Sequence, residues 1–191
     1  MSLSTASDHR PTQLSAAVAT TAAAVVLAFG ALFYLPHRPA PTQQDRIAEL
    51  TARRSELRNA ADLYYHEHGH RYPGEYDPAD GRTPYHRGQE GQAADAFARQ
   101  LTQYTDRDGK ASTRRSTRYH LGPYLPAHAL PANPLMHGGG ADRVQIDFTL
   151  QRPFVVYPPD GRTGWRYYIH TGRLAANDNV RLRNGARVDY Q

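Results

Sequence analysis

The stretch SELRNAADLYYHEHGHRYPG, residues 55–74, contains the end of a helix and also a possible metal site. Leu57, Ala61 and Tyr64 recur at steps of three or four residues, which is the spacing of one apolar face on an α-helix. Gly69 follows the last of them, and glycine is the residue most often found just past a helix C-terminus. We therefore predict that a helix runs through most of this stretch and ends at Gly69.

The same helix can be followed back towards the N-terminus. Ile47 and Leu50 continue the apolar face, so the predicted helix is long and amphipathic. Thr42 is a suitable N-cap, and Asp45, three residues later, can complete a capping box. Pro73, beyond the helix, is a further stop signal.

The letters HEHGH, residues 66–70, also match the His-Glu-x-x-His pattern of zinc proteases. That site needs one continuous helix, so that the two histidines face one metal ion. His68 is polar where such a helix usually buries an apolar residue. We interpret the histidines as exposed side chains after a helix end, with His66 and His70 as candidate zinc ligands. A membrane-tethered zinc hydrolase with Glu67 as its base stays the alternative.

The residues around this motif resemble the end of the long N-terminal helix of type II secretion pseudopilins. The matching positions are Leu57, Ala60, Ala61, Leu63, Tyr64, Tyr65, Gly69, Tyr72 and Pro73. Segments 96–112, 122–135 and 164–179 also look similar to a subgroup of pilin-like proteins, in the same order. The resemblance implies a non-enzymatic structural protein of a type II secretion or envelope assembly. Its partners would be other pilin-like or secretion-system proteins, and its fold would be α+β.

The N-terminus departs from that family. Pilins carry a leader that ends in Gly, followed by a Glu five residues into the mature chain. Here the first Glu is Glu49, and Gly30 lies inside an apolar segment. We therefore expect a pilin-like domain on an ordinary membrane anchor.

The anchor is residues 14–35, a run without charged residues. A helix needs about 20 apolar residues to cross a bilayer. A cleaved signal peptide ending near Ala40 is the competing interpretation. The predicted order is a short tail (1–13), the span (14–35), a proline-rich neck (36–42), the pilin-like domain (43–180) and a C-terminal tail (181–191). The expected location is the cytoplasmic (inner) membrane, single-pass, with the main domain outside the cytoplasm.

The composition excludes several classes of site. The chain of 191 residues has no Cys, which rules out disulfides and thiolate metal sites. Its net charge is +5, and the basic stretch 114–120 lacks the interleaved aromatic residues expected of a nucleic-acid surface. We expect no nucleic-acid partner, and the sequence identifies no small-molecule substrate.

The rest of the domain is predicted to add a second helix around 93–101 and a small antiparallel sheet. Strands are expected at 144–150, at the start of the segment 154–165 before a turn at 160–161, and at 165–174. The tyrosine-rich sheet could be a binding face for an envelope ligand, but packing against the long helix is the interpretation we favour. The aromatic residues concerned are Tyr157, Trp165, Tyr167 and Tyr168.

One further metal candidate lies after the second helix. Asp106 and Asp108 stand in the order Asp-x-Asp-Gly, which is half of a calcium-binding loop. Residue 117 is Thr, where the full loop would have Glu. An aspartate turn explains the same residues. Calcium is the one cofactor that the sequence suggests, and we expect none to be required.

Overall fold

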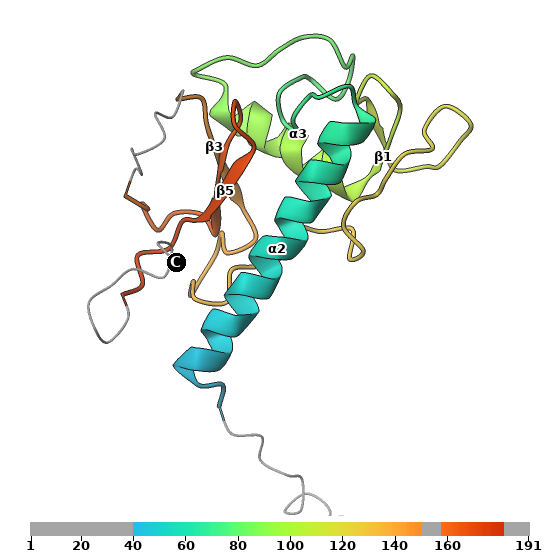
Figure 1. Ribbon diagram of the computed structural model, residues 1–191. Helices are drawn as coiled ribbons and strands as arrows, with labels where there is room; N and C mark the ends of the chain where they lie inside the picture. Colours follow the sequence, from blue (N-terminus) through green and yellow to red (C-terminus); the bar gives the residue numbers. More distant parts are fainter. Residues whose placement is uncertain (1–39, 150–157, 182–191) are drawn as a thin grey trace, which may run out of the picture. The chain divides into compact units, whose positions relative to one another are not determined.

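The computed structural model describes residues 40–149 and 158–181 (Figure 1). The predicted span (14–35) and both predicted tails lie outside these residues, apart from Arg181. Among the described residues, no helix is long and apolar enough to cross a membrane. The elements, in chain order, are α2 (Gln43–Glu67), α3 (Glu90–Thr102), β1 (Tyr104–Thr105), β2 (Ala111–Ser112), β3 (Val144–Asp147), β4 (Trp165–Tyr168) and β5 (Arg173–Ala176). The α+β class is therefore as predicted.

Helix α2 begins at the predicted capping box. The Asp45 backbone N–H donates to the Thr42 hydroxyl at 3.2 Å, and the Thr42 N–H donates back to the Asp45 carboxylate at 2.9 Å. The Thr42 hydroxyl also donates to the Asp45 carboxylate, at 2.7 Å, and this bond together with that from the Thr42 N–H holds the pKa of Asp45 below its usual range. Two of the otherwise unpaired N–H groups at the helix start are satisfied in this way.

One face of α2 is buried, as the periodicity predicts, by Leu50, Leu57, Ala60, Ala61 and Tyr64. The opposite face departs from the amphipathic expectation because it is not uniformly polar. Ala48 and Ala52 are exposed there, and so is Leu63, whose exposed fraction is 50%. The helix thus has apolar residues on its outer side as well as in the core.

The main sheet has the strand order β3-β4-β5. β4 and β5 are antiparallel, but β3 and β4 run parallel, so the prediction of an antiparallel sheet is wrong for this pair. A parallel pair needs a long connection, and more than a dozen residues separate Asp147 from Trp165. A connection of that length can cross over so that β4 runs parallel to β3. The turn residues in the sequence do not indicate such a crossover.

The segment 165–174 forms two strands rather than the single strand predicted. The N–H groups of Thr171 and Gly172 both donate to the Tyr168 carbonyl, at 3.1 and 2.9 Å, and they close a tight turn. Gly172 has φ of +65°, which suits glycine. The hairpin β4–β5 follows from this turn.

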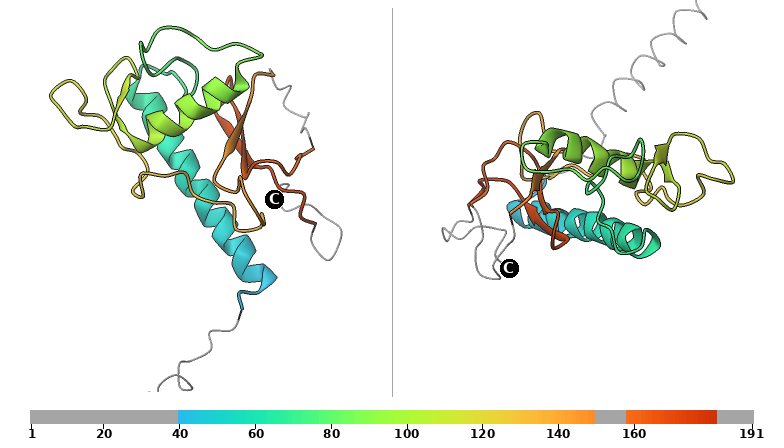
Figure 2. Two further views of the ribbon diagram at one scale, coloured as in Figure 1. Left: turned by 180° about the vertical axis from the view of Figure 1, so that it is seen from behind. Right: turned by 90° about the horizontal axis from the view of Figure 1, so that it is seen from above.

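The two helices cover the sheet towards opposite edges. α3 packs against β3, while α2 packs against β5, and the helices also contact each other (Figure 2). The core between these elements includes Leu57, Phe97, Leu101, Ile146, Trp165 and Tyr167. Trp165, Tyr167 and Tyr168 are buried, so these three do not form an exposed binding face. The Tyr167 ring packs against Phe97 of α3, with centroids 4.7 Å apart, and packing of the cluster against the long helix stays a prediction. Tyr157 lies outside the described residues.

Tyr167 provides a test of this core. Its exposed fraction is 0%, and its hydroxyl has no hydrogen-bond partner among the described residues. A buried, unpaired hydroxyl costs about 1–3 kcal/mol. Tyr167→Phe should therefore leave the free energy of unfolding unchanged or raise it by about 1 kcal/mol, as measured by urea denaturation.

The neighbouring residue supplies the control. The Trp165 indole N–H donates to the Pro131 carbonyl at 2.6 Å. Trp165→Phe removes that bond and part of the core volume, so it should cost about 2–4 kcal/mol. A comparable loss in Tyr167→Phe would mean that the Tyr167 hydroxyl has a partner in the folded chain.

Candidate functional site

The geometry of HEHGH follows from where α2 stops. The helix ends at Glu67, and the next two residues past the His68 cap, Gly69 and His70, have φ of +65° and +64°. The His70 N–H donates to the Tyr65 carbonyl at 2.9 Å, which is the closing bond of a Schellman turn. His66 and His70 are therefore not on one continuous helix, as a His-Glu-x-x-His zinc site requires.

His66 and His70 are both exposed, with ring centroids 6.3 Å apart. The carboxylate of Glu67 does not point at them as a base but accepts a hydrogen bond from the Tyr124 hydroxyl at 2.7 Å. Burial raises the pKa of Tyr124, and the Glu67 carboxylate raises it further, so the hydroxyl remains a donor. This bond ties the end of α2 to the loop after β2.

His68 is the histidine that the sequence interpretation placed wrongly, since only 3% of it is exposed. Its Nδ1 lies 2.9 Å from the Tyr64 carbonyl, and its Nε2 lies 3.1 Å from the Thr105 hydroxyl and 3.0 Å from the Asp106 carbonyl. A carbonyl only accepts, so a hydrogen bond from either ring nitrogen to its carbonyl requires a proton on that nitrogen, and a neutral ring can donate to only one of the two carbonyls at a time. When Nδ1 carries the proton, Nε2 can accept from the Thr105 hydroxyl. The ring also stacks on Tyr64, with centroids 3.8 Å apart.

His68 thus joins the end of α2 to the segment that follows α3. Burial lowers its pKa, and the hydrogen bonds to the two carbonyls oppose that shift in part. The physical reason is that a buried imidazolium loses its hydration. We interpret His68 as a structural link, and its burial explains why the turn at Gly69 is held in place.

The calcium candidates form a turn, the other interpretation left open by the sequence. The Asp106 carboxylate accepts from the backbone N–H groups of Asp108 and Lys110, at 3.1 and 3.0 Å. Its second oxygen accepts from the Arg118 guanidinium at 3.0 Å. Asp108 is half-exposed and lies 3.9 Å from Arg82. Both oxygens of Asp106 therefore already have protein donors.

These observations leave no evident metal centre in the described part of the chain. Within residues 40–149 and 158–181, no group of three or more His, Asp or Glu side chains is arranged to hold a metal ion.

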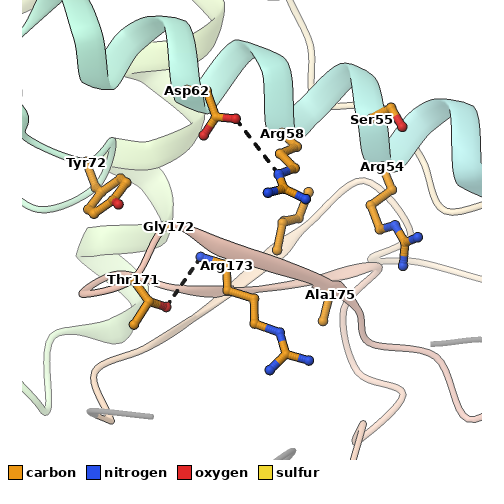
Figure 3. Close-up of a pocket in the computed structure, with 10 residues that line it drawn as sticks. Arg54, Ser55, Arg58, Asp62, Tyr72, Thr171, Gly172, Arg173 and Ala175 are labelled. Carbon is orange, nitrogen blue, oxygen red and sulfur yellow. Dashed lines mark hydrogen bonds and ion pairs between the residues drawn. The ribbon is translucent and has the colours of Figure 1, made fainter. Parts of the chain in front are cut away.

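A groove between α2 and β5 is lined by charged side chains from both elements. Its volume is about 640 Å³. Figure 3 shows Arg54 and Arg58 directed from α2 towards β5, with Asp62 beside Arg58 at 3.8 Å. The turn between β4 and β5 closes the other side through Thr171 and Gly172.

Sequence reasoning did not identify this groove, although one signal was present. The residues three and four positions from Arg54 are Leu50, Thr51, Leu57 and Arg58, and none is acidic. Arg53, by contrast, has Glu49 and Glu56 within 3.6 and 3.3 Å. What could not be foreseen is that β5 would lie opposite Arg54.

Comparison with protein-family models, with curated proteins and with solved structures finds no match for this chain.

Proposed function

We propose that this chain is a non-enzymatic, membrane-anchored, pilin-like protein that acts through protein–protein contacts in a type II secretion or envelope assembly. Its helix α2 is the element through which neighbouring subunits meet. The anchor is the apolar segment 14–35, and the domain that follows lies outside the cytoplasm.

The outer face of α2 is the observation that carries this proposal. Ala48, Ala52 and Leu63 lie on the same side, because they are spaced by about whole helical turns. Small residues allow another helix to approach closely. Leu63 is the one large apolar side chain that is exposed among the described residues. Together with the two alanines, it leaves apolar side chains on the outer side of α2 that another protein can contact.

The inner face gives further support. Four positions that carry the pseudopilin resemblance, Leu57, Ala60, Ala61 and Tyr64, are buried and hold α2 to the domain. Gly69 takes the left-handed conformation that ends the helix. Of the residues that carry the resemblance, these four are therefore buried and fix α2 to the domain, whereas Leu63 is exposed and can contact another protein.

Membrane anchoring is tested with a reporter fused after Gln191. We expect the full chain to remain in the membrane fraction after alkaline extraction, and the reporter to be active only outside the cytoplasm. Deleting residues 14–35 should release the chain from the membrane. A reporter active in the cytoplasm, or release of the full chain by alkali, would overturn the proposed location.

The non-enzymatic assignment is tested by metal analysis of the purified full chain. Exposed His66 and His70 should each be replaceable by Ala with no change in bound zinc. Stoichiometric zinc that disappears in both His66→Ala and His70→Ala would instead support the zinc hydrolase.

A further inference from the structure

The groove between α2 and β5 has an unbalanced charge. On its α2 side two arginines, Arg54 and Arg58, stand against one carboxylate, Asp62. Arg58 is the nearest of them to Asp62, at 3.8 Å, and both of these side chains are more than half exposed. An exposed pair at this distance is weak, so Arg58 remains able to bind another anion.

The positive charge of Arg54 is compensated even less than that of Arg58. It forms no ion pair with any residue that the structure describes, and its neighbour one turn along α2 is a second cation, Arg58. Like charges four residues apart on a helix repel each other. An anion placed between the two guanidinium groups would remove that repulsion. The other arginine at this point of the helix, Arg53, is already placed between two glutamates.

The groove also offers hydroxyl groups. Ser55 lines it from α2, and Thr171 lines it from the turn before β5. The Thr171 hydroxyl oxygen accepts from the Arg173 N–H, and the hydroxyl donates to the Tyr168 carbonyl, both at 3.4 Å; such long bonds can be exchanged for a bond to a ligand (Figure 3). Guanidinium and hydroxyl donors together are the groups that bind phosphate oxygens.

The charge on the α2 side and the size of the groove narrow the ligand class. Arg54 and Arg58 together carry two positive charges, which match the charge of a phosphate monoester near pH 7, about −1.5 to −2. A volume of about 640 Å³ is much larger than one phosphate group and falls in the range of small-molecule sites. Tyr72 and Leu174 provide apolar surface for the rest of the ligand.

We propose that the groove between α2 and β5 binds a small phosphate monoester, with Arg54 and Arg58 contacting the phosphate. The proposal is independent of the assembly function, because the lining residues lie beside the outer face formed by Ala48, Ala52 and Leu63 and do not include it. A phosphate monoester can come from a soluble metabolite or from a lipid headgroup, and both present the same phosphate oxygens.

The test is titration calorimetry on the full chain in detergent, with glycerol 3-phosphate as the soluble probe and dihexanoyl phosphatidate as the lipid probe. We expect one site per chain. Arg54→Gln and Arg58→Gln should each weaken binding about tenfold or more, as loss of a charge-assisted contact does. Binding of both probes indicates a headgroup source, and binding of the first alone indicates a soluble one.

Two further variants make the result specific. Arg53→Gln removes the same charge one residue away, and it should leave the affinity within about twofold, because Arg53 lies outside the groove. Asp62→Asn removes the competing carboxylate and should strengthen binding by about two- to fivefold. The proposal is overturned if neither probe binds at about 10 mM. It is also overturned if Arg53→Gln weakens binding as much as Arg54→Gln does, since that would show a diffuse attraction of anions.

Discussion

Gly164→Ala should lower the free energy of unfolding by about 3 kcal/mol, near the upper end of what overpacking costs. An added Cβ would lie within van der Waals overlap of the Ala141 carbonyl oxygen and 3.1 Å from the Asn133 Cβ. The carbonyl belongs to the backbone, so it cannot swing away as a flexible side chain would. The substitution therefore has to displace a segment of chain.

That segment is held on several sides. The Gly164 N–H donates to the Gly140 carbonyl at 2.8 Å, and the Gly164 carbonyl accepts from the Asn177 N–H at 3.0 Å and from the Asn133 side chain at 3.0 Å. Asn133 is buried, and its own N–H donates to Ala141 at 2.8 Å. Moving Gly164 would strain these bonds together, which is why we expect a large effect.

Gly91→Ala is the matched control. Gly91 lies in α3, and nothing is within 4 Å of the position its Cβ would take. Alanine is the better helix former, so this variant should gain about 0.5–1 kcal/mol. Urea denaturation of the two variants should therefore shift in opposite directions. A Gly164→Ala chain as stable as the parent would show that the segment around Ala141 is loosely packed.

The second large effect is a loss of stability below about pH 6.5, carried by His68. Its folded-state pKa is lowered by burial, whereas an unfolded histidine titrates near 6.5. Above that pH both states are neutral at His68, and its contribution is complete. As the pH falls, the unfolded chain takes up the proton first, so the free energy of unfolding drops by up to about 1.4 kcal/mol per pH unit. The drop from this residue ends at the lowered folded pKa.

Substitution distinguishes His68 from the other histidines. The amide of His68→Gln can both donate and accept a hydrogen bond, as the neutral imidazole can, but it does not titrate. Its urea midpoint should change less than that of the parent between pH 7.5 and 5.5. His70→Gln, at an exposed position, should keep the parent's pH dependence. An unchanged pH dependence in His68→Gln would contradict the assignment.

The parts of the fold that were predictable are those with local causes. The start of α2 needs only Thr42 and Asp45, three residues apart, and its end needs Gly69. The turn at Asp106 depends on backbone groups two and four residues away. In each case the stabilising partner lies within a few residues along the sequence, so the residue types alone indicate the local structure.

The parts that were missed depend on distant partners. The imidazole of His68 binds Thr105 and Asp106, 37 and 38 residues away, so nothing next to His68 in the sequence reveals that it is buried. The parallel pairing of β3 with β4 was missed for the same reason, since the direction of a strand is set by its connection. The groove was missed because predicting it requires the position of β5 relative to Arg54.

The central claim, that the outer face of α2 meets other subunits, can be tested by site-specific cross-linking. The chain has no cysteine, so Ala48→Cys and Ala52→Cys each introduce a single thiol. That thiol can carry a benzophenone group in membranes containing the full chain. Ala79→Cys, exposed in the loop between α2 and α3, is the control position.

We predict that both α2 positions give discrete adducts on irradiation, identified by mass spectrometry as a second copy of this chain or as another pilin-like protein, and that Ala79 gives none. The absence of protein adducts from both α2 positions, or the same adducts from all three positions, would contradict the account.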